Sequence, residues 1–246
     1  MKYIENWKPS KFVFKKGKLR ASRDSKEVGY SSRLVADLVA EFYDHNAKEY
    51  IKGNLIDLGC GKVPLYEVYK NLVSSVTCVD WENTIHKNQF LDYTQDLNQP
   101  LNFADESFDS IILSDVLEHI RRPEALLKEM NRVLAKNGVL MMNVPFYYCL
   151  HEEPFDYYRY TEFALKSMVQ DNGFKIIKLE TIGGAPEILA DIQAKLAIRI
   201  PFVGKFLALF IQKITWWFIK TKFGKKVSKQ TSKKFPLIYV MVAVKE

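Results

Sequence analysis

The stretch NLIDLGCGKVPLYEVY, residues 54–69, decides how this chain is expected to fold. It begins as an apolar strand, runs into Asp57-Leu58-Gly59-Cys60-Gly61 and continues in a helix-like pattern. Glycine lacks a Cβ, so a turn of this kind bends tightly and lets the backbone approach a ligand closely. Two glycines alone are weak evidence, because ordinary turns also use them. The ligand has to be inferred from the rest of the chain.

Apolar strands and helices alternate on both sides of this stretch. Strands are expected over 54–59, 75–80, 108–115, 138–145, 174–180 and 236–244. Helices are expected over 31–50, 64–72, 123–136 and 161–171, the last two ending at Asn137-Gly138 and Asn172-Gly173. Continuous apolar strands separated by helices are typical of a parallel sheet that helices cover on both faces. The sequence therefore predicts an α/β fold with a doubly wound, mostly parallel, Rossmann-like sheet.

The charge of the chain is unevenly distributed, although its net value is only +7 over 246 residues. Residues 1–33 carry ten Lys or Arg against three Asp or Glu, and residues 34–191 carry fourteen against twenty-five. Residues 192–244 carry eleven Lys or Arg and no acid. Cationic flanks around an acidic middle predict an anionic partner, either lipid head groups or nucleic acid. No RNA-binding module is recognisable, so nucleic acid is the distant alternative.

The three cysteines, Cys60, Cys78 and Cys149, lie far apart in the sequence and form no CxxC pair. They predict neither a disulfide framework nor a zinc site. The first twenty residues are polar and basic, without the apolar core of a signal peptide. We therefore expect a reducing, cytoplasmic location.

We expect the chain to have three parts. These are a basic N-terminal extension (1–30), a Rossmann-like domain (31–183 and 235–246) and a helical basic insert (184–234). About 55 residues separate the last two predicted strands, which is far more than an ordinary connection in a compact domain. The insert must therefore do more than close the sheet.

Residues 201–220 of the insert have the pattern of an amphipathic helix with a wide apolar face. A narrow polar strip holds Lys205, Gln212, Lys213 and Lys220, and basic residues continue to Lys234. The lysines interrupt the apolar run too often for a comfortable membrane span. The pattern favours a helix that lies in an anionic membrane interface. A lid over the acceptor cleft and a dimer contact remain alternatives, and the oligomeric state is left open.

Acidic residues recur where successive strands end. Asp80 ends the second strand, twenty-three residues after Asp57, and Asp96-Leu97 follows further on. An acid at this place can accept hydrogen bonds from both ribose hydroxyls, and Trp81 beside it could cover an adenine face. The pyrophosphate pattern G-x-G-x-x-G fails because Pro64 stands at its last position. These acids fit a ligand with ribose, adenine and a positive charge.

The segments LIDLGCGKVP, VTCVDWEN, QDLNQPLNFADESFDSIILSDVLEHI and EMNRVLAKNGVLMMNVP resemble class I S-adenosylmethionine-dependent methyltransferases, in order and in spacing. The resemblance covers about residues 50–180 and implies a seven-stranded sheet with a final antiparallel hairpin. It implies S-adenosyl-L-methionine as the cofactor, with these binding residues: Asp57, Gly59, Cys60 and Gly61 at the methionine end, Asp80 and Trp81 at the ribose and adenine, Asp96 and Leu97 at the adenine, and Ser114 at the amino acid portion. The commonest form of the motif has a third glycine where Val63 stands, so we expect a slightly different turn.

The loop after the fifth strand, VPFYYCLHEEPFDYYRYTEFALKSMVQDNGF, resembles a narrower subgroup with an HxxPxDYxRYT loop. Members of that subgroup are often associated with cell-envelope glycan or lipid assembly. The resemblance implies O-methylation of a glycan or lipid-linked acceptor. Alternatives are a small-molecule or quinone-precursor methyltransferase and a noncatalytic cofactor-binding scaffold docked on a membrane.

Methyl transfer to a hydroxyl needs a positioned base, and histidine is the usual choice near neutral pH. Neither His45 nor His86 lies in the sequence beside other candidate catalytic residues, whereas His119 follows the strand end SDVLE. His151 lies in the loop after the fifth strand, close to Asp156. We expect His151 to be the base or an acceptor ligand, with His119 second and Asp156 orienting.

Structural roles compete with these assignments. His119 could close the cofactor pocket, His151 could fix its loop, and Asp156 with Arg159 could form an ion pair. Asp115, Glu118 and His119 cluster in the sequence, but no second acidic pair accompanies them, so we expect no metal.

Overall fold

The computed structural model describes residues 1–84 and 89–246 and divides the chain into two compact units. The sheet unit comprises Met1–Lys8, Asn46–Glu180 and Tyr239–Glu246. The helical unit comprises Pro9–His45 and Thr181–Ile238. His86, one of the four histidines considered above, lies outside the described residues.

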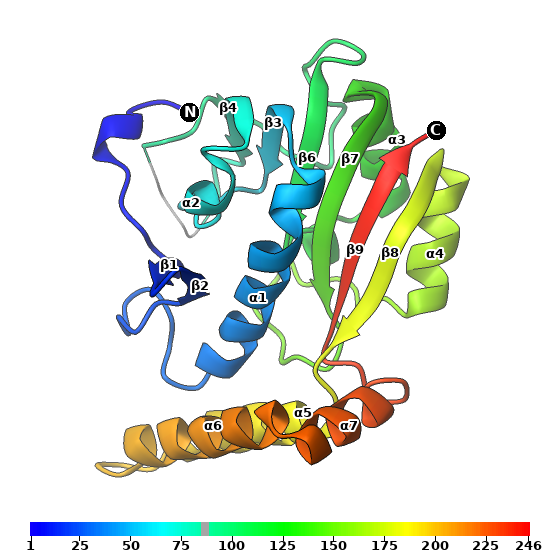
Figure 1. The fold of residues 1–246 in the computed structure, drawn as a ribbon. Coiled ribbons are helices and arrows are strands. Elements are labelled where there is room, and N and C mark those ends of the chain that lie inside the picture. The colour runs from blue at the N-terminus through cyan, green and yellow to red at the C-terminus, as the bar shows by residue number, and fades with distance from the viewer. Residues whose placement is uncertain (85–88) are drawn as a thin grey trace. The chain divides into compact units, whose positions relative to one another are not determined.

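A seven-stranded sheet forms the centre of the sheet unit, in the order β5-β4-β3-β6-β7-β9-β8 (Figure 1). Its strands are β3 (Gly53–Leu58), β4 (Val73–Asp80), β5 (Tyr93–Thr94), β6 (Phe108–Ser114), β7 (Leu134–Pro145), β8 (Phe174–Ile182) and β9 (Ile238–Lys245). The first five run parallel, and β9 runs antiparallel between β7 and β8. The predicted fold class, a mostly parallel Rossmann-like sheet, is confirmed.

Short helices connect these strands. They are α2 (Tyr66–Tyr69), η2 (Leu117–His119), α3 (Pro123–Val133) and α4 (Glu162–Asp171), and a further short helix, η1 (Ile4–Asn6), lies near the N-terminus. Proline at the first position favours the start of α3, and Thr161 caps α4 by accepting a hydrogen bond from the Ala164 amide. The apolar positions of α3 recur at helical spacing and are buried, which fixes that helix on the sheet.

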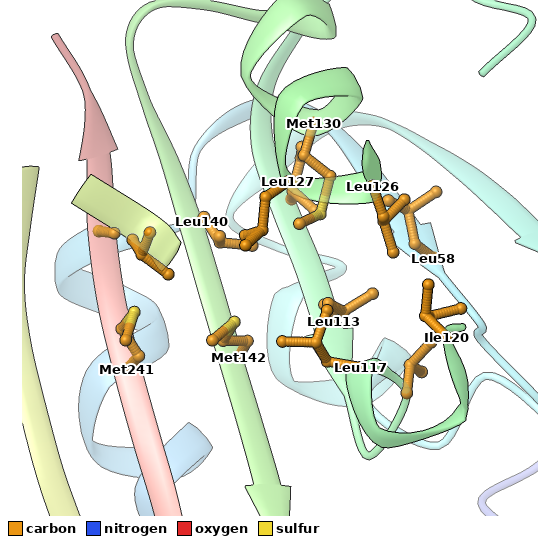
Figure 2. Close-up of a cluster of buried hydrophobic side chains, with 14 of the residues drawn as sticks. Leu58, Leu113, Leu117, Ile120, Leu126, Leu127, Met130, Leu140, Met142 and Met241 are labelled. Carbon is orange, nitrogen blue, oxygen red and sulfur yellow. The ribbon is translucent and has the colours of Figure 1, made fainter. Parts of the chain in front are cut away.

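The main core of the sheet unit lies between β6, β7 and α3 (Figure 2). Leu113 of β6 and Met142 of β7 face Leu126 and Met130 of α3 within one apolar cluster. Leu117 belongs to the same cluster and is completely buried. Burying a leucine stabilises a fold by about 1.5–3 kcal/mol, so this side chain anchors η2 to the core. The two residues after Leu117 are thereby held at the carboxyl end of β6.

Two predicted boundaries are wrong. The predicted helix over 64–72 shrinks to the four residues of α2, and the helix expected to end at Asn137-Gly138 ends at Val133. Asn137 and Gly138 lie inside β7, where Asn137 has a left-handed φ of 62° and the pairing with β6 shifts in register. The pair therefore forms a bulge in a strand, which uses the same backbone conformation as a helix end.

The helical unit contains a hairpin of β1 (Phe12–Lys15) and β2 (Lys18–Ala21), which the sequence did not predict. Its helices are α5 (Ala185–Ala197), α6 (Gly204–Lys220) and α7 (Lys222–Thr231), and α1 (Arg33–Tyr50) begins in this unit. Gln212 of α6 is buried, accepts a hydrogen bond from the Leu34 amide (2.9 Å) and donates one to the Tyr30 carbonyl. The N-terminal segment and the insert thus belong to one unit, and Gln212 is not part of an exposed polar strip.

Candidate active site

The glycine turn after β3 lies where the strand order reverses, between the carboxyl ends of β4, β3 and β6. In open α/β sheets this is the place where ligands bind. The amides of Gly59 and Cys60 donate to the Val79 carbonyl, at 2.8 and 3.1 Å. Gly59 has a φ of 69°, and a Cβ there would lie 2.5 Å from the Val116 side chain. Only glycine fits this position, which brings the turn against the end of β6.

Val63 stands where the commonest form of the motif has a third glycine. Its φ is 52°, in the left-handed region that a β-branched residue rarely adopts. The side chain is completely buried, and the Val63 carbonyl accepts a hydrogen bond from the Trp7 indole at 3.1 Å. Packing therefore holds a valine in a backbone conformation that glycine adopts without strain.

Asp57 is a buried carboxyl group beneath the turn, with 3% of its surface exposed. The Tyr69 hydroxyl donates a hydrogen bond of 2.8 Å to its Oδ2. Burial raises the pKa of Asp57 to about 7; the Tyr69 hydrogen bond opposes the rise, and the nearby charge of Asp80 adds to it. Because the group is poised between its two states near neutral pH, a cation beside it will favour the ionised form.

Asp80 joins the end of β4 to the glycine turn. Its Oδ2 accepts a hydrogen bond from the Gly61 amide (2.9 Å), and its Oδ1 accepts one from the Trp81 amide (2.8 Å). The Trp81 ring meets the ring of Phe155 edge to face, with centroids 4.9 Å apart. Phe155 comes from the loop after β7, so Trp81 connects the predicted cofactor residues with the predicted acceptor loop.

The remaining predicted cofactor residues lie at the ends of β5 and β6. Leu97 is buried in the main core, and Asp96 is exposed and accepts hydrogen bonds from the amide and side chain of Asn98. The Asn98 Oδ1 in turn accepts from the Arg121 amide at 2.8 Å, which fixes this turn beside the start of α3. The Ser114 hydroxyl donates to Oδ1 of Asn143 on β7, also at 2.8 Å.

The loop over residues 146–161 is fastened to η2. The Tyr157 amide donates to the Glu118 carbonyl, and the Tyr160 hydroxyl donates to the Leu117 carbonyl, both at 2.9 Å. Within the loop, Arg159 donates to both carboxylate oxygens of Asp156 at 2.6 and 2.7 Å. Although burial raises the pKa of Asp156, the hydrogen bonds from Arg159 and the His151 amide lower it overall. The ion pair considered as a structural alternative for Asp156 and Arg159 is therefore present.

His119 and His151 meet over a buried carboxylate. Their ring centroids are 4.8 Å apart, and the Nε2 atoms of His119 and His151 lie 3.8 and 3.6 Å from Oε1 of Glu118. Glu118 is completely buried, and burial raises the pKa of its carboxyl group. Burial lowers the pKa of His151, but the carboxylates of Glu118 and Asp156 outweigh it and raise that pKa overall. His45, by contrast, is exposed on α1.

Glu118 is the site residue that the sequence did not bring forward. Its position directly before His119, in SDVLEH, was the only available signal. The sequence groups it only with Asp115 and His119, in a cluster that lacks a second acidic pair. Its burial comes from η2 being covered by the loop over 146–161, and no local pattern reports such a contact.

The fold defines the class of this protein as an α/β protein of Rossmann type, with the predicted cofactor residues at its strand ends. Residues 56–142 match a family model described as a methyltransferase domain. The matched residues include the glycine turn, Asp80, Asp96, Ser114 and His119, and they end before His151. This match confirms the predicted enzyme class and cofactor, an S-adenosylmethionine-dependent methyltransferase.

Several solved structures share the fold. A chain described as the (4+2)-cyclase SpnF is 15% identical, with a TM-score of 0.57, covering 96% of this chain and 87% of that one. An S-adenosylmethionine-dependent methyltransferase from Archaeoglobus fulgidus is 17% identical, with a TM-score of 0.55, covering 90% and 97%. One from Mesorhizobium loti is 13% identical, with a TM-score of 0.55, covering 86% and 100%. Among curated proteins, none matches the sequence. At these identities the likenesses establish the fold.

Proposed function

We propose that this protein transfers a methyl group from S-adenosylmethionine to a hydroxyl group of a glycan or lipid-linked acceptor. The observation that carries the proposal is the pair of histidines over buried Glu118. His151 belongs to the loop whose Phe155 contacts Trp81, one of the predicted cofactor residues. A candidate base close to the expected cofactor position is the arrangement that an active site requires. The resemblance of the HxxPxDYxRYT loop to envelope-associated methyltransferases supports this class of acceptor.

The cofactor residues fit the chemistry of the proposed ligand. Asp57 and the backbone of Gly59 and Gly61 would hold the methionine end, where the ligand is cationic, and Asp80 would accept from the ribose hydroxyls. Asp96 and Leu97 would meet the adenine, Trp81 would cover its face, and Ser114 would border the amino acid portion. When bound, S-adenosylmethionine supplies an electrophilic methyl group on a positively charged sulfur.

The chain's own contribution to the reaction is alignment and proton removal. His151 would take the proton of the acceptor hydroxyl at Nε2 while the new carbon–oxygen bond forms and the carbon–sulfur bond breaks. Asp156 fixes the opposite side of the ring, since its Oδ2 lies 3.2 Å from His151 Nδ1. Holding the reacting groups in line and excluding water supplies the rest of the acceleration.

Alanine variants test this assignment. His151→Ala should lower the rate of methyl transfer about 10²–10⁴-fold, the range for a general base, with unchanged affinity for S-adenosylhomocysteine in calorimetry. His119→Ala should give a smaller loss, and His45→Ala, at an exposed position, is the matched control. The assay follows transfer of labelled methyl groups to lipid and glycan extracts. Undiminished turnover of the His151 variant would remove this residue from the mechanism, and tight cofactor binding without any product would favour the noncatalytic scaffold.

We also propose that the helical unit brings this enzyme to the anionic cytoplasmic face of a membrane. The apolar stripe of α6 is exposed and consists of Val203, Phe206, Leu207, Phe210, Ile214 and Trp217. Neighbouring α5 exposes Leu189, Ile192 and Leu196, and α7 exposes four lysines. Among the described residues, no helix is long and apolar enough to span a bilayer. An apolar face flanked by lysines matches the chemistry of an anionic lipid interface.

Vesicle flotation tests the membrane proposal. The full chain should float with phosphatidylcholine vesicles that contain phosphatidylglycerol and much less with phosphatidylcholine alone. Replacing Phe206, Phe210 and Trp217 together by serine should abolish flotation, whereas Phe163→Ser changes an equally exposed side chain on α4 and should have no effect. Flotation of the triple variant at the wild-type level would overturn the proposal. A dimer that the triple variant loses in solution would instead assign the stripe to a second copy of the chain.

A further inference from the structure

We propose that Glu118, His119 and His151 form a binding site for a divalent transition-metal ion. One nitrogen from each histidine and one carboxylate oxygen all lie within 4.8 Å of one another. The shorter separations are 3.6 Å, between Glu118 Oε1 and His151 Nε2, and 3.8 Å, between the same oxygen and His119 Nε2. Ligands at about 2.0–2.2 Å from a tetrahedral zinc ion lie about 3.3 Å apart, so a small contraction of the three side chains completes the site. The sequence alone had led us to expect no metal here.

Three buried polar atoms of this cluster lack hydrogen-bond partners within the described part of the chain. Both carboxylate oxygens of Glu118 are buried in this state, and so is Nε2 of His119. Unsatisfied buried polar atoms are uncommon in folded proteins, and an uncompensated carboxylate is especially costly. A cation between Oε1 of Glu118 and the two Nε2 atoms would compensate the buried carboxylate and give His119 Nε2 a partner.

The other side of each imidazole is already occupied. His119 Nδ1 lies 3.0 Å from the Phe155 carbonyl oxygen, and His151 Nδ1 lies 3.2 Å from Asp156 Oδ2. An acceptor at Nδ1 favours the tautomer with its proton there, which leaves the lone pair of Nε2 directed at Glu118. Histidines that bind metals usually have this arrangement, with a carbonyl or carboxylate behind the ring. Arg159 in turn fixes Asp156 through two hydrogen bonds.

The composition of the site selects the type of ion. Two imidazoles and one carboxylate suit zinc, cobalt, manganese or ferrous iron, whereas magnesium prefers oxygen ligands and retained water. Three protein ligands leave at least one coordination position open, as in catalytic sites. The His151 side chain is 25% exposed, so an acceptor hydroxyl can reach that position. An ion lowers the pKa of a bound hydroxyl, so on the proposed function the ion would activate the acceptor, whose proton would pass to solvent. With the ion bound, Nε2 of His151 is a ligand, and His151 is the base only in the metal-free protein.

The binding experiment uses the full chain after treatment with a chelator. Zinc titration by calorimetry should show one saturable site, and cobalt should give the visible absorption bands of a low-symmetry site with nitrogen ligands. Glu118→Gln and His151→Ala should each weaken zinc binding at least 10-fold, whereas His45→Ala and magnesium serve as controls. If Glu118→Gln unfolds the protein, His151→Ala still tests the site. His151 is partly exposed, so its replacement should disturb the fold less. The proposal would be overturned if neither variant weakened zinc binding, or if the wild type showed no saturable binding. Water would then be the expected occupant of the cluster.

A parallel methyl-transfer assay separates this proposal from the proposed function. Full activity of the chelated protein, together with no zinc binding, would remove the metal and leave His151 as the base. Zinc binding that depends on Glu118, without any methylated product, would keep the metal site and remove the proposed reaction. Restoration of lost activity by zinc or cobalt, but not by magnesium, is the result expected if the ion activates the acceptor, with His151 as a ligand and not as the base.

Discussion

In the sheet unit the unusual side chain is a carboxylate that is buried, whereas in the helical unit the unusual side chains are large apolar groups that are exposed. Glu118 is completely buried, and Phe206 is 68% exposed. Each residue departs from the burial expected for its type, and such departures carry more information than ordinary burial does. We propose a partner outside the polypeptide for each, a cation for the buried carboxylate and an apolar surface for the exposed side chains. On these proposals, the two units indicate their partners by opposite departures from the usual burial of each residue type.

Truncating one apolar side chain in each unit should give the largest contrast. Leu117→Ala removes a completely buried side chain and should cost about 2–5 kcal/mol of unfolding free energy, because a cavity remains. Phe206→Ala removes an exposed side chain and should change that free energy by less than about 0.5 kcal/mol. Urea unfolding of both variants measures the difference. A comparable loss at Phe206 would mean that the stripe is packed against the protein itself.

Two glycines with the same backbone angle sharpen the comparison. Gly59 and Gly17 have φ values of 69° and 70°, but only Gly59 would place a Cβ against another side chain, 2.5 Å from Val116. Gly59→Ala should cost about 2–5 kcal/mol from backbone strain and overpacking together, whereas Gly17→Ala should cost about 1–2 kcal/mol from strain alone. Thermal and urea unfolding provide the measurement. Equal losses at the two positions would show that the turn after β3 yields to make room.

The buried carboxyl group of Asp57 makes the stability of the sheet unit depend on pH. None of the groups discussed above in the helical unit has such an effect. The Asp57 pKa of about 7 in the folded state is above the ordinary aspartate value of 3.8, so the folded chain binds the proton more tightly than the unfolded chain. This contribution to stability is complete below pH 3.8 and is lost as the pH rises through 7. Between pH 5 and pH 7 the wild type should lose roughly 2 kcal/mol relative to Asp57→Asn. A difference between the two proteins that is independent of pH would contradict the burial effect.

The same group predicts how cofactor affinity varies with pH. A cationic ligand favours the ionised form of Asp57, so S-adenosylmethionine should bind more tightly as the pH rises from 6 to 8. The expected gain below pH 7 approaches tenfold for each unit, which corresponds to the release of one proton. Calorimetry in two buffers of different ionisation enthalpy would detect that proton. Asp57→Asn should bind with an affinity that does not change over this range.

The smallest expected effect is at the helical unit's surface. Lys220 pairs with Glu41 at 2.7 Å, and both side chains are more than one third exposed. Exposed pairs contribute about 0.2–1 kcal/mol, so Lys220→Ala should scarcely alter the unfolding free energy. Arg159→Ala in the sheet unit should cost more, because the Asp156 side chain it leaves behind is only 2% exposed. Both losses of unfolding free energy are measured in the same denaturant series. Their ratio tests whether the buried Arg159–Asp156 pair contributes more than the exposed Lys220–Glu41 pair.

Much of the sheet unit could be predicted because its signals are local. Apolar runs predict six of the seven strands, and only the two-residue β5 has no such run. The order of Asp57 and Asp80 along the chain predicts both carboxyl groups at neighbouring strand ends, where the Gly61 amide bonds to Asp80. Other features could not be predicted, because they depend on contacts between distant segments. Glu118 is covered by a loop whose contacting residues lie about 40 positions further along the chain. Gln212, predicted on the polar strip of its helix, is buried and bonded to residues near the N-terminus. Asn137-Gly138 shows a third limit, since one local signal serves both helix ends and strand bulges.

The order of strands in the sheet also bears on how the chain is made. β9 lies between β7 and β8, yet 55 residues separate the end of β8 from the start of β9. While the ribosome extends the insert, β7 and β8 each present an open edge toward the vacant place. Open edges pair readily with strands of other chains. A nascent chain that stalls in the insert is thus exposed to aggregation until Ile238 and the residues after it emerge.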